Sequence, residues 1–277
     1  MTLERDIEDA VSAAKKVLLN TLDLREERAG SRNPYGDESL VLDLMAEREI
    51  IEILGSSDNE FAVLTEEGGL MRLGSRPEYL AIVDPIDGST NLSRGIPLCS
   101  VGIAVAPYQA GLTDSAIVLS RIESVFTDDI FEALSGRGVT RNGEPVHVAR
   151  PKPIGESIVS YDTKCRWDDS FASASAAVLS SVRDMRRTGS NLLDLCLTAA
   201  GALDAMIDLR NILPIVHVSG THMVREAGGV VLDERCNNMI LPLELPQRMS
   251  FVAASSVELA TAILGEFHRG QKLRHRL

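Results

Sequence analysis

The apolar positions of the chain recur at two spacings, which predict helices alternating with strands. Helical intervals separate the apolar residues of segment 3–28, which are Leu3, Ile7, Val11, Ala14, Val17 and Leu18. Residues 39–54 predict a second helix, and residues 29–38 between the two (AGSRNPYGDE) have the composition of a polar turn. Short apolar runs bounded by Gly, Pro or acidic residues predict strands at residues 61–64, 79–83, 100–105 and 115–119.

The second half of the chain continues this alternation beyond a predicted boundary. Asn142-Gly143 stands between two strand-like runs, which is typical of a two-residue hairpin turn. Pro151-Lys152-Pro153 then predicts a division into subdomains at residues 1–150 and 151–277. The pattern beyond it predicts, in order, a strand at 157–161, helices at 169–183 and 190–201, a strand at 205–209, a helix at 218–227, a strand at 250–254 and a helix at 257–268. The fold class is therefore a layered α/β or α+β protein, whose first sheet we expect to be antiparallel.

Composition and charge narrow the functional classes. The 277 residues include 40 acidic and 28 basic side chains, which gives a formal net charge of −12. This excess of negative charge opposes binding to the phosphates of nucleic acids. No apolar run reaches the ~18 residues that a membrane-spanning helix needs, and the first residues lack the apolar core of a signal peptide. We therefore expect a cytoplasmic protein that binds neither nucleic acid nor membrane.

Four carboxylates follow two of the predicted strands. Glu66-Glu67 follow the run 61–64, and Asp84 and Asp87 follow the run 79–83. If these strands are neighbours, the four carboxylates converge at one end of the sheet, which is unfavourable unless a cation neutralises them. Mg²⁺ prefers carboxylate oxygens and water as ligands. The sequence therefore predicts a divalent-metal site at this end of the sheet.

An anion site is expected directly after the second acidic pair. Pro85 has a fixed φ and Gly88 permits a tight turn, so that the preceding carboxylates can point to one place. Ser89-Thr90-Asn91 then offers hydroxyls and free backbone N–H groups at the start of a helix. A metal beside a helix N-terminus is the combination that a phosphate ester requires.

The segment DPIDGSTN, together with Glu66-Glu67, resembles the inositol monophosphatase superfamily. Further motifs of that family follow in order, namely Gly136-Arg137-Gly138 with Asn142-Gly143, Gly201-Ala202-Leu203-Asp204 and Glu226-Ala227-Gly228-Gly229. The SRGIP segment resembles archaeal members that act on both inositol phosphates and fructose 1,6-bisphosphate. The resemblance implies a five-layer αβαβα sandwich of the sugar phosphatase type, usually dimeric, that hydrolyses phosphate monoesters with two or three Mg²⁺ ions.

The resemblance also implies roles for the acidic cluster. Glu66, Asp84 and the carbonyl of Ile86 would hold one metal ion, and Asp84 would bridge to a second ion that Asp87 shares. Ser89 would orient or help to deprotonate the attacking water together with Glu66. The catalytic residues would thus be Glu66, Asp84 and Ser89.

The same resemblance assigns the substrate contacts to two segments. The backbone amides of Gly88 and Ser89 would hold the phosphate. Gly189, Ser190 and Asp208, in the second half of the chain, would face the hydroxyls of the substrate.

One position departs from the family's pattern. Counting back from the Glu-Ala-Gly-Gly segment, the aspartate that completes the family's second metal site falls on Val216, which cannot bind Mg²⁺. Three interpretations are open. His217 supplies a nitrogen ligand, which would favour Mn²⁺ or Zn²⁺; or the second ion binds weakly through Asp84 and Asp87; or the protein has lost catalysis and binds a phosphorylated ligand or partner. His222 lies five residues after His217 rather than four, so a metal-binding pair of histidines is disfavoured.

The sequence as a whole predicts a phosphoric monoester hydrolase that depends on Mg²⁺ or Mn²⁺. Its expected substrate is a small phosphorylated metabolite of the inositol monophosphate or fructose 1,6-bisphosphate class, and its expected partner is a second copy of the chain. The alternative is a catalytically impaired family member that binds such a ligand or a protein partner.

Overall fold

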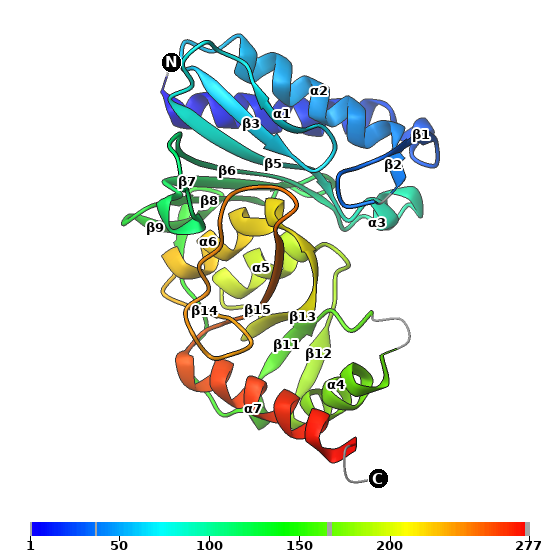
Figure 1. Cartoon of the computed structure of the whole chain (residues 1–277), viewed down its shortest axis with the longest axis vertical. Helices are drawn as coiled ribbons and strands as arrows, with labels where there is room; N and C mark the ends of the chain where they lie inside the picture. Colours follow the sequence, from blue (N-terminus) through cyan, green and yellow to red (C-terminus); the bar gives the residue numbers. More distant parts are fainter. Residues whose placement is uncertain (1, 37, 165–167, 275–277) are drawn as a thin grey trace.

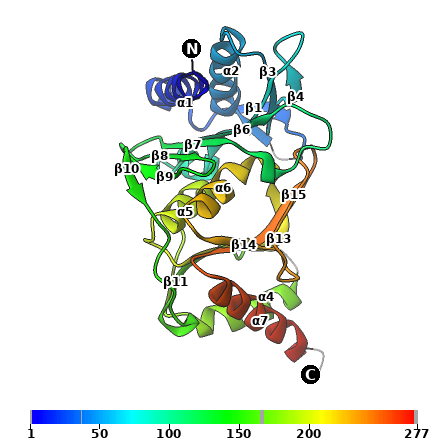
Figure 2. The ribbon, with the colours of Figure 1, turned by 90° about the vertical axis from the view of Figure 1, so that its left-hand side faces the viewer.

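Two β-sheets alternate with three pairs of helices along the long axis of the molecule (Figure 1). The computed structural model describes residues 2–36, 38–164 and 168–274. The helix pairs are α1 (Leu3–Asn20) with α2 (Val41–Gly55), α5 (Asn191–Ala199) with α6 (Val218–Glu226), and α4 (Asp169–Ser181) with α7 (Val257–Arg274). Figure 2 shows the second pair between the two sheets and the other pairs at the two ends of the molecule. The five-layer αβαβα sandwich is therefore confirmed.

The first sheet has eight strands, in the order β10-β9-β8-β7-β6-β5-β3-β4. Its strands are β3 (Phe61–Thr65), β4 (Gly69–Arg72), β5 (Tyr79–Asp87), β6 (Ser100–Pro107), β7 (Leu119–Ser124), β8 (Ile130–Leu134), β9 (Gly138–Arg141) and β10 (Glu144–Val146). All neighbours pair antiparallel except β3 and β5, which run parallel. Because β3 and β5 are parallel, their carboxyl ends meet at one edge, as the expected convergence of the acidic pairs requires.

The second sheet has five strands, in the order β12-β11-β13-β15-β14. They are β11 (Ile158–Tyr161), β12 (Asp184–Arg186), β13 (Ala205–Pro214), β14 (Val230–Leu232) and β15 (Arg248–Ala254). A separate hairpin of β1 (Arg28–Arg32) and β2 (Glu38–Leu40) lies beside the first sheet, and a short helix α3 (Ser89–Ser93) follows β5. The last strand of the first sheet ends at residue 146 and the first strand of the second begins at 158. The subdomain division at residue 150 remains a prediction.

Three hydrophobic cores lie between the layers of the described part of the chain. The outer core joins α1 and α2 to the first sheet through side chains such as Ile7, Ile50 and Phe61. The central core joins both sheets to α5 and α6, and the third joins the second sheet to α4 and α7. Burial on both faces explains why the first part of β5 reads as an uninterrupted apolar run rather than an alternating one.

A β-bulge near the end of β5 brings the two aspartates of that strand together. Asp84 pairs with Gly102 of β6 and Asp87 pairs with Ser100, so three steps along β5 oppose two steps along β6. Side chains alternate between faces in a regular strand, and residues three apart would point in opposite directions. The extra residue of the bulge corrects this alternation. Asp84 and Asp87 consequently reach one site.

Most of the predicted elements are present, and the differences have local causes. The helix expected over 3–28 ends at Asn20, after which a 3₁₀ turn spans Leu22–Leu24. The strand expected over 79–83 continues to Asp87, because the bulge accommodates Pro85 within it. The Asn142-Gly143 hairpin is confirmed, with φ values of 53° and 82° at the two residues.

Two expectations were wrong. The run 115–119 was expected to be a strand, but Asp114–Ala116 forms a 3₁₀ turn and β7 starts only at Leu119. The Asp114 carboxylate accepts hydrogen bonds from Arg225 (2.8 Å) and from the backbone N–H of Leu241 (2.8 Å), so distant partners hold this segment out of the sheet. Residues 29–38 were expected to be a polar turn throughout. A turn is present at residues 34–36, but residues 29–32 and 38 belong to the paired strands of the β1–β2 hairpin, and residue 37 lies outside the described residues.

Candidate active site

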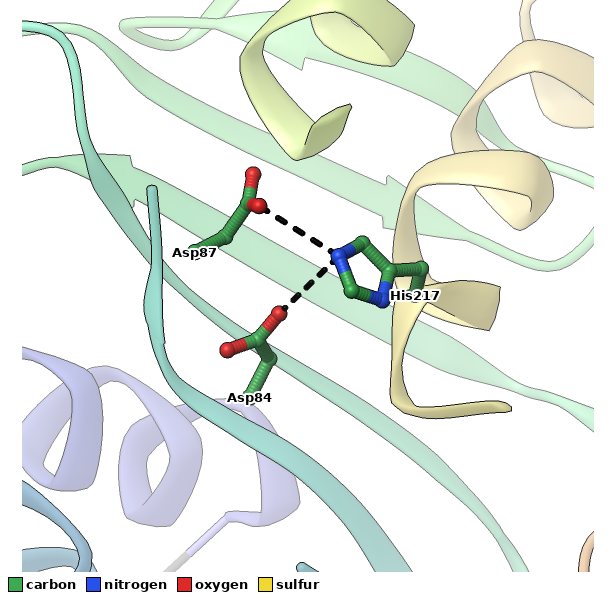
Figure 3. Close-up of side chains that lie close together, drawn as sticks. All are labelled: Asp84, Asp87 and His217. Atoms are coloured by element: carbon green, nitrogen blue, oxygen red, sulfur yellow. Dashed lines mark hydrogen bonds and ion pairs between the residues drawn. The ribbon is translucent and has the colours of Figure 1, made fainter. Parts of the chain in front are cut away.

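Asp84 and Asp87 of β5 face His217 across the boundary between the first sheet and the helices below it (Figure 3). His217 closes the 3₁₀ turn Ile215–His217, which leads from β13 into α6. Its Nε2 atom lies 3.4 Å from Oδ2 of Asp84 and 3.3 Å from Oδ1 of Asp87. All three side chains are buried, and one ligand atom from each lies within 4.8 Å of the others.

Asp84 is the most unusual of the three because its carboxylate is buried without hydrogen bonds. It is 1% exposed, and neither of its oxygens has a hydrogen-bond partner among the described residues. Burial raises the pKa of Asp84 well above its ordinary value; the charge of His217 lowers it, while Asp87 and Glu66 raise it further. A buried carboxylate with two bare oxygens calls for a cation, and this side chain therefore fits a metal ion.

The cluster also raises the pKa of His217. Burial alone would lower it, but the hydrogen bond to Asp87 and the charges of Asp84, Asp87 and Glu66 raise it to about 10. The negative charges of the surrounding carboxylates thus favour the protonated form of the imidazole.

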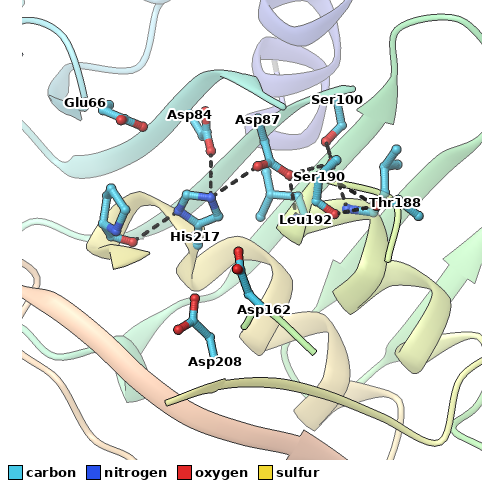
Figure 4. Close-up of polar contacts among 12 residues, drawn as sticks. Glu66, Asp84, Asp87, Ser100, Asp162, Thr188, Ser190, Leu192, Asp208 and His217 are labelled. Atoms are coloured by element: carbon cyan, nitrogen blue, oxygen red, sulfur yellow. Dashed lines mark hydrogen bonds and ion pairs between the residues drawn. The ribbon is translucent and has the colours of Figure 1, made fainter. Parts of the chain in front are cut away.

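The N-terminus of α5 holds the second oxygen of Asp87 (Figure 4). The Ser190 hydroxyl donates to Oδ2 of Asp87 at 2.5 Å, and the backbone N–H of Leu192 donates to the same atom at 2.6 Å. Ser190 also caps the helix by accepting from the N–H of Leu193 at 3.2 Å, and its hydroxyl lies 3.1 Å from that of Ser100. These contacts fix the orientation of the Asp87 carboxylate and leave its Oδ1 directed at His217.

Glu66 extends the acidic cluster from the end of β3. Its Oε1 accepts a hydrogen bond from the Asn33 side chain at 3.1 Å. Burial raises the pKa of Glu66 to about 7; His217 lowers it, and Glu67, Asp43 and Asp87 raise it further. Asp43, at the start of α2, also has its pKa raised to about 7, mainly by burial. Carboxylates from β3, β5 and α2 therefore surround one place.

A cavity of about 280 Å³ opens beside this cluster. Its walls come from the β1–β2 hairpin, α2 and the ends of β3 and β5, and are formed by Arg28, Asn33, Glu38, Asp43, Glu66, Glu67, Asp84, Pro85, Ile86, Ser89 and Thr90. Three residues predicted to be catalytic, Glu66, Asp84 and Ser89, thus line a single cavity together with Ile86.

Gly88 stands between this cavity and the short helix α3. Its φ of 93° lies in the left-handed region that favours glycine, and an added Cβ would come within 3.0 Å of the Leu98 carbonyl. Gly88 is therefore required for the turn that carries Ser89 into the cavity.

The residues expected to contact substrate occupy more enclosed positions. Ser190 is fully buried beneath Asp87. Gly189, with φ +86°, packs so closely on Asn91 that an added Cβ would lie 2.8 Å from its Nδ2 atom. Asp208 is fully buried and forms an ion pair with Arg210 at 2.5 Å. Their roles in substrate binding remain predictions.

The position predicted for the missing aspartate lies in the hydrophobic core. Val216 is fully buried and belongs to the central core between the two sheets. The neighbouring His217 is the residue of this turn that faces Asp84 and Asp87 (Figure 3). His222 lies elsewhere, with its Nδ1 atom 2.9 Å from the Ser120 hydroxyl.

Several contacts that organise the site gave no signal in the sequence. Asn33 binds Glu66 from the hairpin, and the Tyr35 hydroxyl donates to the Gln247 carbonyl while accepting from the Ile215 N–H, both at 3.2 Å. These partners lie far apart along the chain, and only the assembled layers bring them together. The Ser190 contact had a partial signal, since serine is a favoured residue before a helix.

Comparison with known proteins shows the family to which the chain belongs. Residues 3–272 match the inositol monophosphatase family. The fructose-1,6-bisphosphatase/inositol-1-monophosphatase of Methanothermobacter thermautotrophicus is 31% identical over 239 residues, which is 83% of each chain. Nus factor SuhB of Vibrio cholerae is 31% identical over 231 residues, covering 81% of this chain and 83% of that protein.

Solved structures show the same fold. The crystal structure of an inositol monophosphatase-fructose 1,6-bisphosphatase superposes with a TM-score of 0.83 at 24% identity, over 96% of this chain and all (100%) of that one. The extragenic suppressor protein SuhB from Bartonella henselae superposes with a TM-score of 0.82 at 25% identity, over 96% of this chain and 98% of that one. The chain described here therefore belongs to the inositol monophosphatase family.

Proposed function

We propose that this protein is a divalent-metal-dependent phosphatase that hydrolyses a small phosphate monoester of the inositol monophosphate or fructose 1,6-bisphosphate class. Membership of a family that contains such phosphatases supports the reaction type. The observation that carries the proposal is the bare, buried carboxylate of Asp84, which shares a cavity with Glu66 and Ser89.

Glu66, Asp84, Asp87 and the carbonyl of Ile86 are the residues that would hold Mg²⁺ or Mn²⁺. Ile86 lies in the bulge of β5, and a bulge leaves backbone groups outside the ladder of the sheet, so its carbonyl is a suitable ligand. A bound divalent ion lowers the pKa of a water ligand and neutralises charge on the leaving oxygen.

The protein's own side chains would position the reactants. Glu66, oriented by Asn33, would accept the proton of the attacking water, and the Ser89 hydroxyl would orient that water from the opposite wall of the cavity. The backbone amides of Gly88 and Ser89 would bind the phosphate oxygens, and Asp208 and Gly189 would face the alcohol portion of the ester. Ser190 would act indirectly, because its hydroxyl donates to Asp87 and so orients that carboxylate.

We also propose that the protein is located in the cytoplasm and forms a homodimer. Within the part of the chain that the structure describes, no helix is long and apolar enough to span a membrane.

The direct test is phosphate release by the purified chain with Mg²⁺ or Mn²⁺. Inositol 1-phosphate, fructose 1,6-bisphosphate, a 3′-phosphonucleotide and p-nitrophenyl phosphate form the substrate panel. We expect metal-dependent turnover of an inositol or fructose phosphate. No release from any of the four at saturating metal would contradict the proposal.

A second candidate is a binding role without catalysis. It is favoured by the replacement at Val216 and by the similarity to proteins named Nus factor SuhB. In that case the same panel would give saturable binding in calorimetry without phosphate release, so one set of samples separates the two functions.

A further inference from the structure

His217 has the hydrogen bonding of a metal-ligating histidine. Its Nδ1 atom lies 3.2 Å from the Pro214 carbonyl, to which an Nδ1–H group donates. Histidines that bind metal through Nε2 usually donate their other N–H to a carbonyl or carboxylate, which fixes the tautomer and the orientation of the ring. With Nδ1 engaged in this way, Nε2 is the ring nitrogen that faces the two carboxylates of β5 (Figure 3), and a metal ion bound there would take the place of its proton.

The spacing of the three donor atoms fits a shared ion. Tetrahedral bonds of roughly 2.1 Å to nitrogen and oxygen place neighbouring donors about 3.4 Å apart. The observed separations from Nε2 are 3.4 Å to Asp84 and 3.3 Å to Asp87. A charged N–H···O⁻ hydrogen bond is shorter, about 2.7–2.9 Å, and a single Nε2–H group cannot point at both acceptors.

The surroundings of the two carboxylates complete this picture. Asp87 is held through its other oxygen by Ser190 and Leu192, and carboxylates that bind metals are commonly hydrogen-bonded in this way. Asp84 is 1% exposed, has no hydrogen-bond partner among the described residues, and is directed at the same point. Donor atoms from β5 and from the turn before α6 therefore converge on one place.

We propose that Asp84, Asp87 and His217 form a mixed oxygen and nitrogen site that selects a first-row transition ion, such as Zn²⁺, Co²⁺ or Mn²⁺, over Mg²⁺. The inference rests on the proposed function, since it names the class of ion at one part of that site. Imidazole suits transition ions, whereas Mg²⁺ prefers an octahedron of oxygens. Affinity is expected to increase in the order Mn²⁺, Co²⁺, Zn²⁺, with Mg²⁺ weakest, and to depend on His217.

Co²⁺ binding to the full-length, metal-free protein tests the proposal without reference to catalysis. Titration should produce the intense visible absorption of low-coordinate Co²⁺, and Zn²⁺ should displace it while Mg²⁺ at equal concentration should not. The variant His217→Gln should lose this absorption and bind Co²⁺ at least about tenfold more weakly, as expected from the loss of a ligand. The matched control is His147→Gln, which removes an exposed histidine and should titrate like the wild type.

A measurement on the wild-type protein covers the case in which His217→Gln does not fold. X-ray absorption of the Zn²⁺-loaded chain should show the scattering pattern of a coordinated imidazole. Coordination by oxygen alone would overturn the proposal, and so would an unchanged Co²⁺ affinity in a folded His217→Gln variant. Either result is expected if His217 only shares a proton with the two carboxylates and binds no metal. If the protein gave such a result but hydrolysed phosphate esters with Mg²⁺, the proposed phosphatase function would be supported and the His217 site would not. If Co²⁺ bound through His217 without any hydrolysis, the metal site would be supported and the phosphatase function would not.

Discussion

At the scale of single residues, the site consists of buried charged side chains, and the protonation of each depends on the charges of its neighbours. Asp84 has no hydrogen bonds, and Asp87 has one oxygen held by α5 and one directed at His217. Neutralising Asp84 removes repulsion between carboxylates and leaves Asp87 facing His217. Substitution of an acidic member by its amide should therefore affect metal binding more than stability.

Asp84→Asn is expected to abolish divalent-dependent phosphate release while the protein stays folded. The amide keeps the shape of the side chain but removes the charge that a metal needs, and loss of such a ligand should cost several kcal/mol of transition-state stabilisation. Steady-state rates and circular dichroism measure the two effects. The control Asp184→Asn changes an exposed carboxylate on β12 and should retain wild-type rates. Activity of Asp84→Asn within about threefold of wild type would remove Asp84 from the mechanism.

Val216→Asp is expected to destabilise the protein rather than to create a metal ligand. Val216 packs in the central core, where a carboxylate would be buried without a partner and would lower the free energy of unfolding by several kcal/mol. Urea unfolding measures this loss. Val216→Thr, similar in shape but uncharged, is the matched control and should lose less. A stable Val216→Asp protein with tighter Mg²⁺ binding would show instead that position 216 reaches the ions.

At the scale of elements, the β1–β2 hairpin forms one wall of the cavity. Strand β1 is mostly exposed, but Asn33 holds Glu66 and Tyr35 joins the hairpin to the turn that carries His217. Burial raises the pKa of Tyr35 to about 12, so its hydroxyl is protonated and donates at neutral pH. Asn33 and Tyr35, together with the Ser39 hydroxyl that donates to Glu67, thus connect a peripheral element to the site.

Tyr35→Phe is expected to loosen the hairpin without unfolding the sheets. The change removes the hydrogen bonds to Ile215 and Gln247 and keeps the ring that packs near Arg248. Hydrogen exchange in residues 28–36 should become faster, while exchange in β5 and β6 should stay slow. If exchange in the hairpin were the same in wild type and variant, the tyrosine would not hold this wall.

The helices and strands that the sequence predicted can be compared with those in the structure. Hydrophobic spacing located the long helices and the buried strands, because these depend on local patterns. It could not locate the turn at Asp114, whose partners Arg225 and Leu241 are distant in sequence, or the strand beyond residue 83, which requires pairing with β6. At the site, the DPIDGSTN segment and Glu66-Glu67 predicted that Glu66, Asp84 and Ser89 come together, whereas His217 was only one of three interpretations left open by Val216.

At the scale of the whole molecule, the site joins the two halves of the chain. Asp84 and Asp87 come from the eight-stranded sheet, whereas His217 and the N-terminus of α5 come from the second half. The two sheets share no strand, and these contacts lie beside the central core that joins them. A metal between the halves should therefore stabilise the entire fold.

Divalent ions are expected to raise the melting temperature of the protein. An ion that binds only the native state adds about 2.7 kcal/mol of stability at a concentration 100-fold above its Kd. Calorimetry with increasing metal, and with a chelator as reference, measures the shift. Asp84→Asn should melt at the same temperature with and without metal. If the melting temperature of the wild type did not change with metal, the ion would not join the two halves of the chain.

The position of Asp84 on a central strand also determines how quickly a bound ion can leave. One wall of its cavity is β5, which is paired on both sides, and another is formed by residues of the β1–β2 hairpin. We therefore expect a bound ion to exchange with solvent more slowly while the hairpin is held in place. The residence time of the ion should depend on the hydrogen bonds of Asn33 and Tyr35. Two variants with equal affinity for the metal would then differ in how quickly they release it.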